Sequence, residues 1–109
     1  MHAAKAIDAL GALAQEHRLK LFRLLVQAGA EGMAAGDLAR AIDIPNSSLS
    51  FHLGHLHRAG LIEQRRAGRS LIYSADYRAM DRLVAYLMEN CCGGAGCAPV
   101  SASLEKETA

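Results

Sequence analysis

The chain has 109 residues, with 12 lysines and arginines against 11 acids and a net charge of +1. This length suits one domain with its own hydrophobic core, and the near-neutral charge by itself gives no sign of a nucleic-acid partner. Apolar runs stay well short of the ~18 residues that a membrane span requires, and the start of the chain lacks a signal-peptide layout, so we expect a cytoplasmic protein.

Two amphipathic helices are predicted at the start of the chain. Residues 3–14 carry Ile7, Leu10, Leu13 and Ala14 on one side. In residues 17–28 the apolar positions recur at the i, i+3, i+4, i+7 spacing of a helix face; they are Leu21, Leu24, Leu25 and Ala28. Gly29 then fits the position that ends a helix.

A helix-turn-helix motif is predicted next. A short helix over residues 35–41 is followed by the turn Asp43-Ile44-Pro45 and by a helix that runs to about residue 59. Proline is tolerated in the first turn of a helix, where its missing N–H would have had no partner. Two helices joined by so tight a turn are typical of this motif. A glycine-turn hairpin over residues 61–66 and 70–74 follows, and a last helix covers residues 76–90.

The second helix of the motif has a core face and an outward face. Leu49, Leu53 and Leu56 fall within about 60° of one another around the helix axis and are predicted to face the core. The other side is small, polar and nearly free of acids, which suits contacts with phosphates, base edges or a thymine methyl group. The predicted DNA contacts on this helix are Ser47, Ser48, Ser50, Phe51, His52 and His55, with Arg58 beside them.

The positive charge of the chain gathers in its middle. Between residues 40 and 69 there are five arginines against two acids. Arg65, Arg66 and Arg69 lie at the predicted tip of the hairpin, where arginines suit a phosphate backbone or a narrow minor groove. We therefore add these three side chains to the predicted DNA contacts.

The order of two helices, a helix-turn-helix, a basic hairpin and a last helix resembles the ArsR/SmtB family of winged-helix repressors. The resemblance covers roughly residues 5–92. It is strongest over residues 45–62, which read PNSSLSFHLGHLHRAGLI, and over the hairpin tip RRAGR. His17-Arg18-Leu19 and the leucines after it also look like the second helix of that family. The resemblance implies a homodimer built on the first and last helices, which binds two-fold operator DNA and is released by an inducer.

The three cysteines of the chain, Cys91, Cys92 and Cys97, lie together around a Gly-Gly-Ala-Gly run. In a reducing cytosol, clustered thiols indicate metal binding or redox sensing more than a structural disulfide. Thiolates select soft ions. A structural zinc site needs four ligands, whereas three thiolates suit As(III) or Sb(III), whose lone pair occupies the fourth direction. We therefore predict that the trio binds As(III) as inducer, with Sb(III) as a second ligand.

The resemblance implies two other sensor positions, and neither has its ligands here. The family's cysteine pair on the first helix of the DNA-binding unit would fall in residues 33–38, which contain no cysteine. Its carboxylate-and-histidine zinc site would fall in the last helix, which contains no histidine. The end of the chain instead resembles arsenic-responsive members with a C-terminal cysteine trio.

Thiol oxidation remains an alternative. Adjacent Cα atoms lie ~3.8 Å apart, which is less than the ~4.4–6.8 Å of most disulfides. A Cys91–Cys92 bridge would therefore be strained, whereas Cys97 can pair with either neighbour. Two further alternatives are a response to another soft metal and, outside regulation, a small cytosolic metal-binding protein without DNA function.

Together these features predict a mostly α-helical α+β fold of the winged helix-turn-helix type. Residues 1–92 are expected to form the DNA-binding and dimerisation domain, and residues 93–109 a flexible tail that contributes Cys97. If the last helix reaches residue 92, Cys91 and Cys92 continue its apolar stripe of Val84, Leu87 and Met88. The sequence has no nucleophile–base pair, phosphate loop or HExxH motif, so we expect neither enzymatic activity nor a catalytic cofactor.

Overall fold

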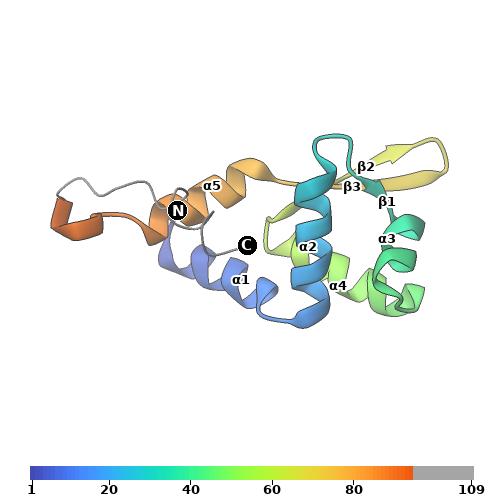
Figure 1. Cartoon of the computed structure of the whole chain (residues 1–109), viewed down its shortest axis with the longest axis horizontal. Helices are drawn as coiled ribbons and strands as arrows, with labels where there is room; N and C mark the ends of the chain where they lie inside the picture. Colours follow the sequence, from blue (N-terminus) through green and yellow to red (C-terminus); the bar gives the residue numbers. More distant parts are fainter. Residues whose placement is uncertain (95–109) are drawn as a thin grey trace, which may run out of the picture.

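The computed structural model describes residues 1–94 of the chain. The helices are α1 (Ala3–Leu13), α2 (Glu16–Ala28), α3 (Ala35–Ile42), α4 (Asn46–Arg58) and α5 (Tyr77–Leu87), the strands are β1 (Met33–Ala34), β2 (Ile62–Ala67) and β3 (Ser70–Ala75), and a 3₁₀ turn, η1, spans Cys91–Gly94. This order is the predicted winged helix-turn-helix (Figure 1). Within the described part, no helix is long and apolar enough to cross a membrane.

Helix α2 forms the centre of the hydrophobic core. It packs against α1, α3, α4 and β3, and its Leu21 and Leu25 have no exposed surface. The Gln15 side chain caps its start by accepting a hydrogen bond from the Arg18 backbone N–H at 2.9 Å. At its other end the Tyr77 hydroxyl donates to the Val26 carbonyl at 2.9 Å. These contacts fix α2 as the frame on which the other elements are positioned.

The sheet has three antiparallel strands in the order β1-β3-β2. The predicted hairpin is confirmed, since β2 pairs with β3 from Ile62↔Ala75 to Ala67↔Ser70 around Gly68. Strand β1 was not predicted because two residues are too short to show a pattern. It lies beside β3 because Gly32 has φ +71° and no side chain; a Cβ there would lie 2.1 Å from the Tyr73 carbonyl oxygen.

The helix-turn-helix is confirmed as α3 and α4. Asp43 adopts a left-handed conformation with φ 53° and ends α3, which turns the chain sharply toward α4. Leu49, Leu53 and Leu56 are buried as predicted, together with Leu38 of α3. The core face of α4 therefore has the orientation that its leucine spacing indicates.

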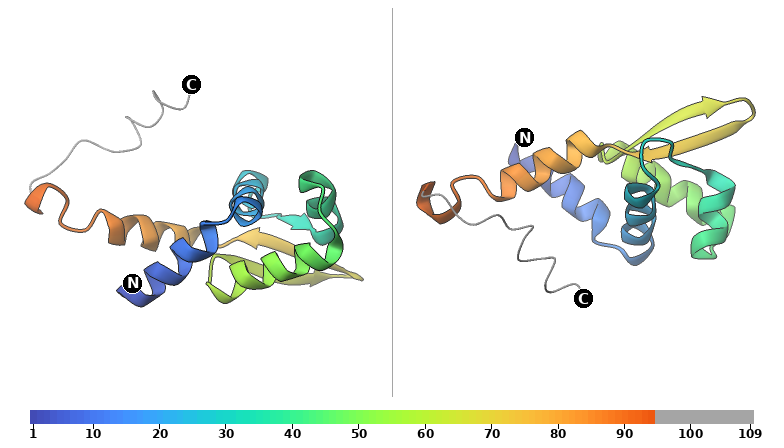
Figure 2. Two further views of the ribbon diagram at one scale, coloured as in Figure 1. Left: turned by 90° about the horizontal axis from the view of Figure 1, so that it is seen from below. Right: turned by 45° about the horizontal axis from the view of Figure 1, so that its top comes forward.

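Helices α1 and α5 pack together at one end of the molecule, whereas α3 and the hairpin lie toward the other (Figures 1 and 2). The buried side of α1 consists of Ala6, Ala9 and Ala12. The larger Ile7 and Leu10 are 67% and 42% exposed. Of the apolar stripe predicted on this helix, Ile7 and Leu10 therefore face away from the core of the single chain, whereas Leu13 packs against it.

Helix α5 is shorter than predicted, which corrects the expected position of the cysteines. It begins at the Asp76 cap, whose side chain accepts a hydrogen bond from the Ala79 N–H at 3.1 Å, and it ends at Leu87. Asn90 and Cys92 have φ angles of 57° and 56°, which a right-handed helix does not contain. Cys91 and Cys92 thus lie in η1 and do not continue the stripe of α5.

Candidate DNA interface and thiol segment

The outward side of α4 presents the predicted polar surface. Ser47 and Ser50 are exposed and Ser48 is half-buried. The first turn of α4 contains no acid, so the backbone N–H groups and the positive end of the helix dipole face solvent without a competing carboxylate. Such a helix start suits a phosphate group, and the serine hydroxyls can donate hydrogen bonds beside it.

Phe51 and His55 extend this surface along α4. The Phe51 side chain is 60% exposed, and its ring lies 6.3 Å from the half-buried His55 ring at an interplanar angle of 81°. Burial and the nearby Arg18 and Arg58 lower the pKa of His55. The imidazole is thus kept closer to its neutral form until an anion such as a phosphate approaches.

The structure corrects the predicted position of His52. Its side chain is only 9% exposed, and it points toward α2 and not outward with Phe51. Its Nδ1 lies 3.4 Å from a terminal nitrogen of Arg18, and its ring centre is 5.4 Å from that of His17. We therefore remove His52 from the side chains expected to touch DNA. His17 is half-buried beside it.

Arg18 is a polar core residue that the sequence reading missed. It is 9% exposed, and its Nε donates a 2.7 Å hydrogen bond to the Ala12 carbonyl oxygen. A signal was present in the sequence, because Arg18 occupies the same helix face as Leu21, Phe22 and Leu25 at the i+3, i+4 and i+7 spacing. An arginine within an apolar stripe indicates a specific buried partner.

The wing, which we define as β2, β3 and their connecting turn, carries the three predicted arginines. All three are exposed, and the hairpin extends from the body of the molecule (Figure 1). Arg65 donates a 2.8 Å hydrogen bond to the Glu31 carbonyl oxygen and so ties β2 to the loop before β1. Arg66 and Arg69 are the wing cations best placed to meet a phosphate backbone.

The described part of the thiol segment contains Cys91 and Cys92. Their Sγ atoms lie 3.6 Å apart; Cys91 is half-buried and Cys92 is exposed. Cys97 lies outside the described residues, so the predicted trio is not placed as a unit. Among residues 1–94 no group of three histidine, cysteine or acidic side chains is arranged to hold a metal ion.

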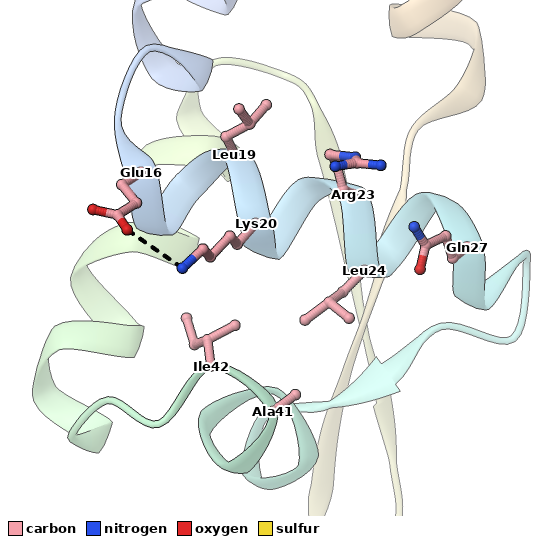
Figure 3. A pocket seen from close by; sticks show the side chains of 8 residues that line it. All are labelled: Glu16, Leu19, Lys20, Arg23, Leu24, Gln27, Ala41 and Ile42. Carbon is pink, nitrogen blue, oxygen red and sulfur yellow. Dashed lines mark hydrogen bonds and ion pairs between the residues drawn. The ribbon is translucent and has the colours of Figure 1, made fainter. Parts of the chain in front are cut away.

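A groove of about 430 Å³ lies between α2 and α3 (Figure 3). Its apolar lining comes from Leu19, Leu24, Ala41 and Ile42. A Glu16–Lys20 ion pair of 3.3 Å lies at its edge. Leu19 is 45% exposed here. The lining offers no thiol or imidazole, so this groove does not suit a thiophilic ion.

Comparison with known proteins identifies the family. A helix-turn-helix domain model matches residues 13–65. The chain is 31% identical over 86 residues to the transcriptional activator HlyU of Vibrio cholerae, covering 76% of this chain and 77% of HlyU. It is also 34% identical over 79 residues to a Halobacterium salinarum protein that carries the name of an arsenical resistance operon repressor, ArsR, covering 72% of this chain and 60% of that protein.

Solved structures agree with these relatives. The structure of HlyU from Vibrio cholerae has a TM-score of 0.63 at 31% identity, covering 78% of this chain and 92% of that chain. An ArsR-like regulator from Rhodococcus sp. RHA1 has a TM-score of 0.69 at 22% identity, with 96% and 87% covered, and supports the fold alone. The helix-turn-helix, the wing and these relatives together show that the chain belongs to the ArsR/SmtB family of winged-helix transcriptional regulators.

Proposed function

We propose that this regulator is a homodimeric repressor that binds operator DNA and is released when As(III) or Sb(III) binds Cys91, Cys92 and Cys97. The observation that carries the proposal is the 3.6 Å separation of the Cys91 and Cys92 sulfur atoms. A soft ion would join the two sulfurs in η1, which begins four positions after the last residue of α5. The name of the ArsR relative, an arsenical resistance repressor, supports the same effector class.

The spacing of the two sulfurs suits a shared ion. Metal–thiolate bonds are about 2.3 Å long for zinc, and two sulfurs at tetrahedral angles around such an ion lie roughly 3.8 Å apart. A smaller angle, as in a pyramidal three-sulfur complex, brings them closer. The observed 3.6 Å lies in this range, and adjacency in the chain keeps the pair together before any ion arrives. Cys97 would supply the third sulfur.

DNA binding is proposed to use the outward side of α4 and the wing. In helix-turn-helix proteins the second helix enters the major groove with its first residues at the base edges. Here those residues are the exposed Ser47 and Ser50, followed by Phe51. Arg66 and Arg69 of the wing would contact the backbone alongside, where they add affinity without sequence preference.

The second copy is proposed to cover the exposed apolar side chains of α1 and α5. Val84 and Leu87 are 53% and 56% exposed on α5, Met88 at its C-cap is 36% exposed, and Ile7 and Leu10 are exposed on α1, which packs against α5. Several exposed apolar side chains on two packed helices suit a protein contact. Because only residues 88–90 separate η1 from α5, an ion bound at η1 would act three residues beyond this contact and could change the spacing of two recognition helices.

Fluorescence anisotropy with a labelled duplex from directly upstream of the chain's own gene tests the proposal. Under reducing conditions, arsenite should release the wild-type protein. Cys91→Ser, Cys92→Ser and Cys97→Ser should bind the duplex normally and resist release. Ser101→Ala changes a hydroxyl in the same part of the sequence and should respond like the wild type. Release of the triple serine variant by arsenite would contradict the proposal.

The same assay separates thiol oxidation from metalloid binding. Two cysteine sulfur atoms 3.6 Å apart are also suited to oxidative chemistry. A redox switch would release the duplex with peroxide in the absence of arsenite, and dithiothreitol would reverse it. A reporter gene under the upstream sequence then gives the direction of regulation, for which HlyU carries the name of an activator. A repressor raises reporter output on arsenite addition.

A further inference from the structure

Arg18 is an unusual core residue because no carboxylate of residues 1–94 forms an ion pair with it. Arginine side chains are rarely buried without an ionic partner. The ion pairs within residues 1–94 are Glu16–Lys20 and Asp37–Arg40, and neither includes Arg18. Its buried contacts are instead a carbonyl oxygen and an imidazole. The guanidinium therefore depends on two uncharged acceptors, one of which can take up a proton.

These contacts connect three helices. Arg18 lies in the first turns of α2, its Nε donates to the Ala12 carbonyl at the end of α1 at 2.7 Å, and its terminal nitrogen lies 3.4 Å from Nδ1 of His52 in α4. Helix α1 belongs to the proposed dimer surface and α4 is the recognition helix. The Arg18 side chain is thus a direct link between the two functional parts of the chain.

The chemistry of the link requires a neutral His52. A guanidinium carries only hydrogen-bond donors, so Nδ1 of His52 must act as the acceptor, with the ring proton on Nε2. Protonation would turn Nδ1 into a donor facing a donor and place two positive charges 3.4 Å apart. The contact would then change from attractive to repulsive.

The charged groups around His52 also disfavour its protonated form. His17 and Arg18 face it from α2, and His55 lies near it on α4. Helices α1 and α3 and strand β2 also pack against α4; Asp8 of α1 lies beside His55 and Arg58, and within residues 1–94 the groups whose charge shifts His52 are His17, Arg18 and His55. Burial first, and then His17, Arg18 and His55, lower the pKa of His52. The surroundings of this imidazole are therefore uniformly unfavourable to a positive charge.

We propose that Arg18 is a positioning residue for the recognition helix, and that protonation of His52 releases α4 from this contact and weakens DNA binding. The inference rests on the proposed DNA function. Acidification would thereby reduce operator occupancy without any metalloid. The effect for one proton is limited to about tenfold in affinity per pH unit.

The direction of the pH effect follows from linkage. The folded-state pKa of His52 lies below the usual 6.5, so the unfolded chain binds more protons in the window between the two values. Stability is then fully present above the unfolded-state value and is lost as the pH falls from about 6.5 toward the folded-state value. A histidine that gained a carboxylate partner would show the opposite trend.

The test compares the wild type with His52→Asn between pH 7.5 and 5.5. Asparagine places an acceptor oxygen near the position of Nδ1 and cannot titrate. His57→Asn, an exposed histidine on the same helix, is the matched control, and His52→Gln replaces His52→Asn if that variant does not fold. One arm measures affinity for the upstream duplex, and the other measures urea unfolding of the DNA-free protein.

We expect the wild type and His57→Asn to lose affinity and stability relative to His52→Asn as the pH falls, with an affinity ratio that changes roughly two- to tenfold. Protonation of His55 beside DNA occurs in the wild type and in His52→Asn alike, so its effect cancels in the ratio of their affinities. If the wild type and His52→Asn show the same change in unfolding free energy with pH, the inference is overturned. If the unfolding free energies of the wild type and His52→Asn diverge with pH while their DNA affinities change in parallel, Arg18 does not position the recognition helix. Failure of the wild type to bind DNA at pH 7.5 overturns the proposed function instead, while the unfolding arm still decides the His52 contact.

Discussion

Among the wing arginines, Arg69 is the one at the turn between β2 and β3. It is exposed, and within residues 1–94 its side chain makes no hydrogen bond or ion pair, whereas Arg65 is held by the Glu31 carbonyl. A side chain of this kind can reach a phosphate without first breaking an internal contact. Arg69 is therefore the clearest single-residue test of the wing.

Arg69→Ala should weaken binding to every duplex by a similar factor and reduce the slope of log affinity against log salt by about one. The reason is the loss of one phosphate contact and its released counterion. Lys20→Ala removes the same charge from α2, where Lys20 pairs with Glu16 at 3.3 Å, and should leave the slope unchanged. An Arg69→Ala slope equal to that of the wild type would remove the wing from the proposed interface.

Single residues also show what spacing alone can predict. Leu49, Leu53 and Leu56 are buried as their helical spacing indicates. His52 lies at the edge of this leucine face, about 40° around the helix from Leu56, and is buried too, although its polarity favoured the outward side. The difference is the Arg18 side chain from α2, which supplies a partner 34 residues away in the chain. A periodicity argument within one helix has no access to such a partner.

At the scale of elements, the attachment of β1 to the sheet depends on one close backbone contact. Gly32→Ala would place a methyl group 2.1 Å from the Tyr73 carbonyl oxygen at a residue with φ +71°. We expect a loss of about 1–3 kcal/mol in the free energy of unfolding, since both a backbone shift and a left-handed alanine are required. Urea unfolding measures it.

Gly29→Ala is the matched control for this change. Gly29 also has a positive φ of 80°, but a Cβ there meets no atom within 4 Å. Its backbone, with φ 80° and ψ −166°, is one that only glycine adopts readily, so Gly29→Ala should cost about 1–3 kcal/mol for the conformation alone, without the steric contact that Gly32→Ala adds. Equal losses in the two variants would show that the close backbone contact between Gly32 and Tyr73 contributes nothing to the loss of stability in Gly32→Ala.

Element boundaries were less predictable than element identities. All five helices and the hairpin were expected in their observed order. The end of α5 was placed too late because its apolar spacing continues into Cys91 and Cys92. The left-handed Asn90 breaks the helix there, and asparagine is one of the few residues that tolerate this conformation.

At the scale of the whole molecule, the exposed apolar surface of α1 and α5 predicts a dimer. Leu87→Glu places a charge on a side chain that is 56% exposed, so the single chain should fold while the dimer dissociates. Sedimentation equilibrium should give a monomer, and affinity for a two-half-site duplex should fall by more than tenfold because the linked second contact is lost.

Leu19→Glu provides the control for a surface leucine elsewhere. Leu19 is 45% exposed on α2, in the groove beside α3, and its substitution should leave the dimer intact. A dimeric Leu87→Glu protein, or a monomeric wild type, would contradict the assignment of this surface.

The sequence by itself determined the fold class, the helix-turn-helix, the outward serines of α4 and the basic wing, because periodic spacing and turn residues act over a few neighbouring positions. The cysteine segment as the place for a soft ligand stays a prediction from the sequence. Only the tertiary structure decided that Ala6, Ala9 and Ala12 bury α1 while Ile7 and Leu10 face outward, and that Arg18 joins α1, α2 and α4. These features depend on how closely helices distant in the sequence approach one another, which no local pattern encodes.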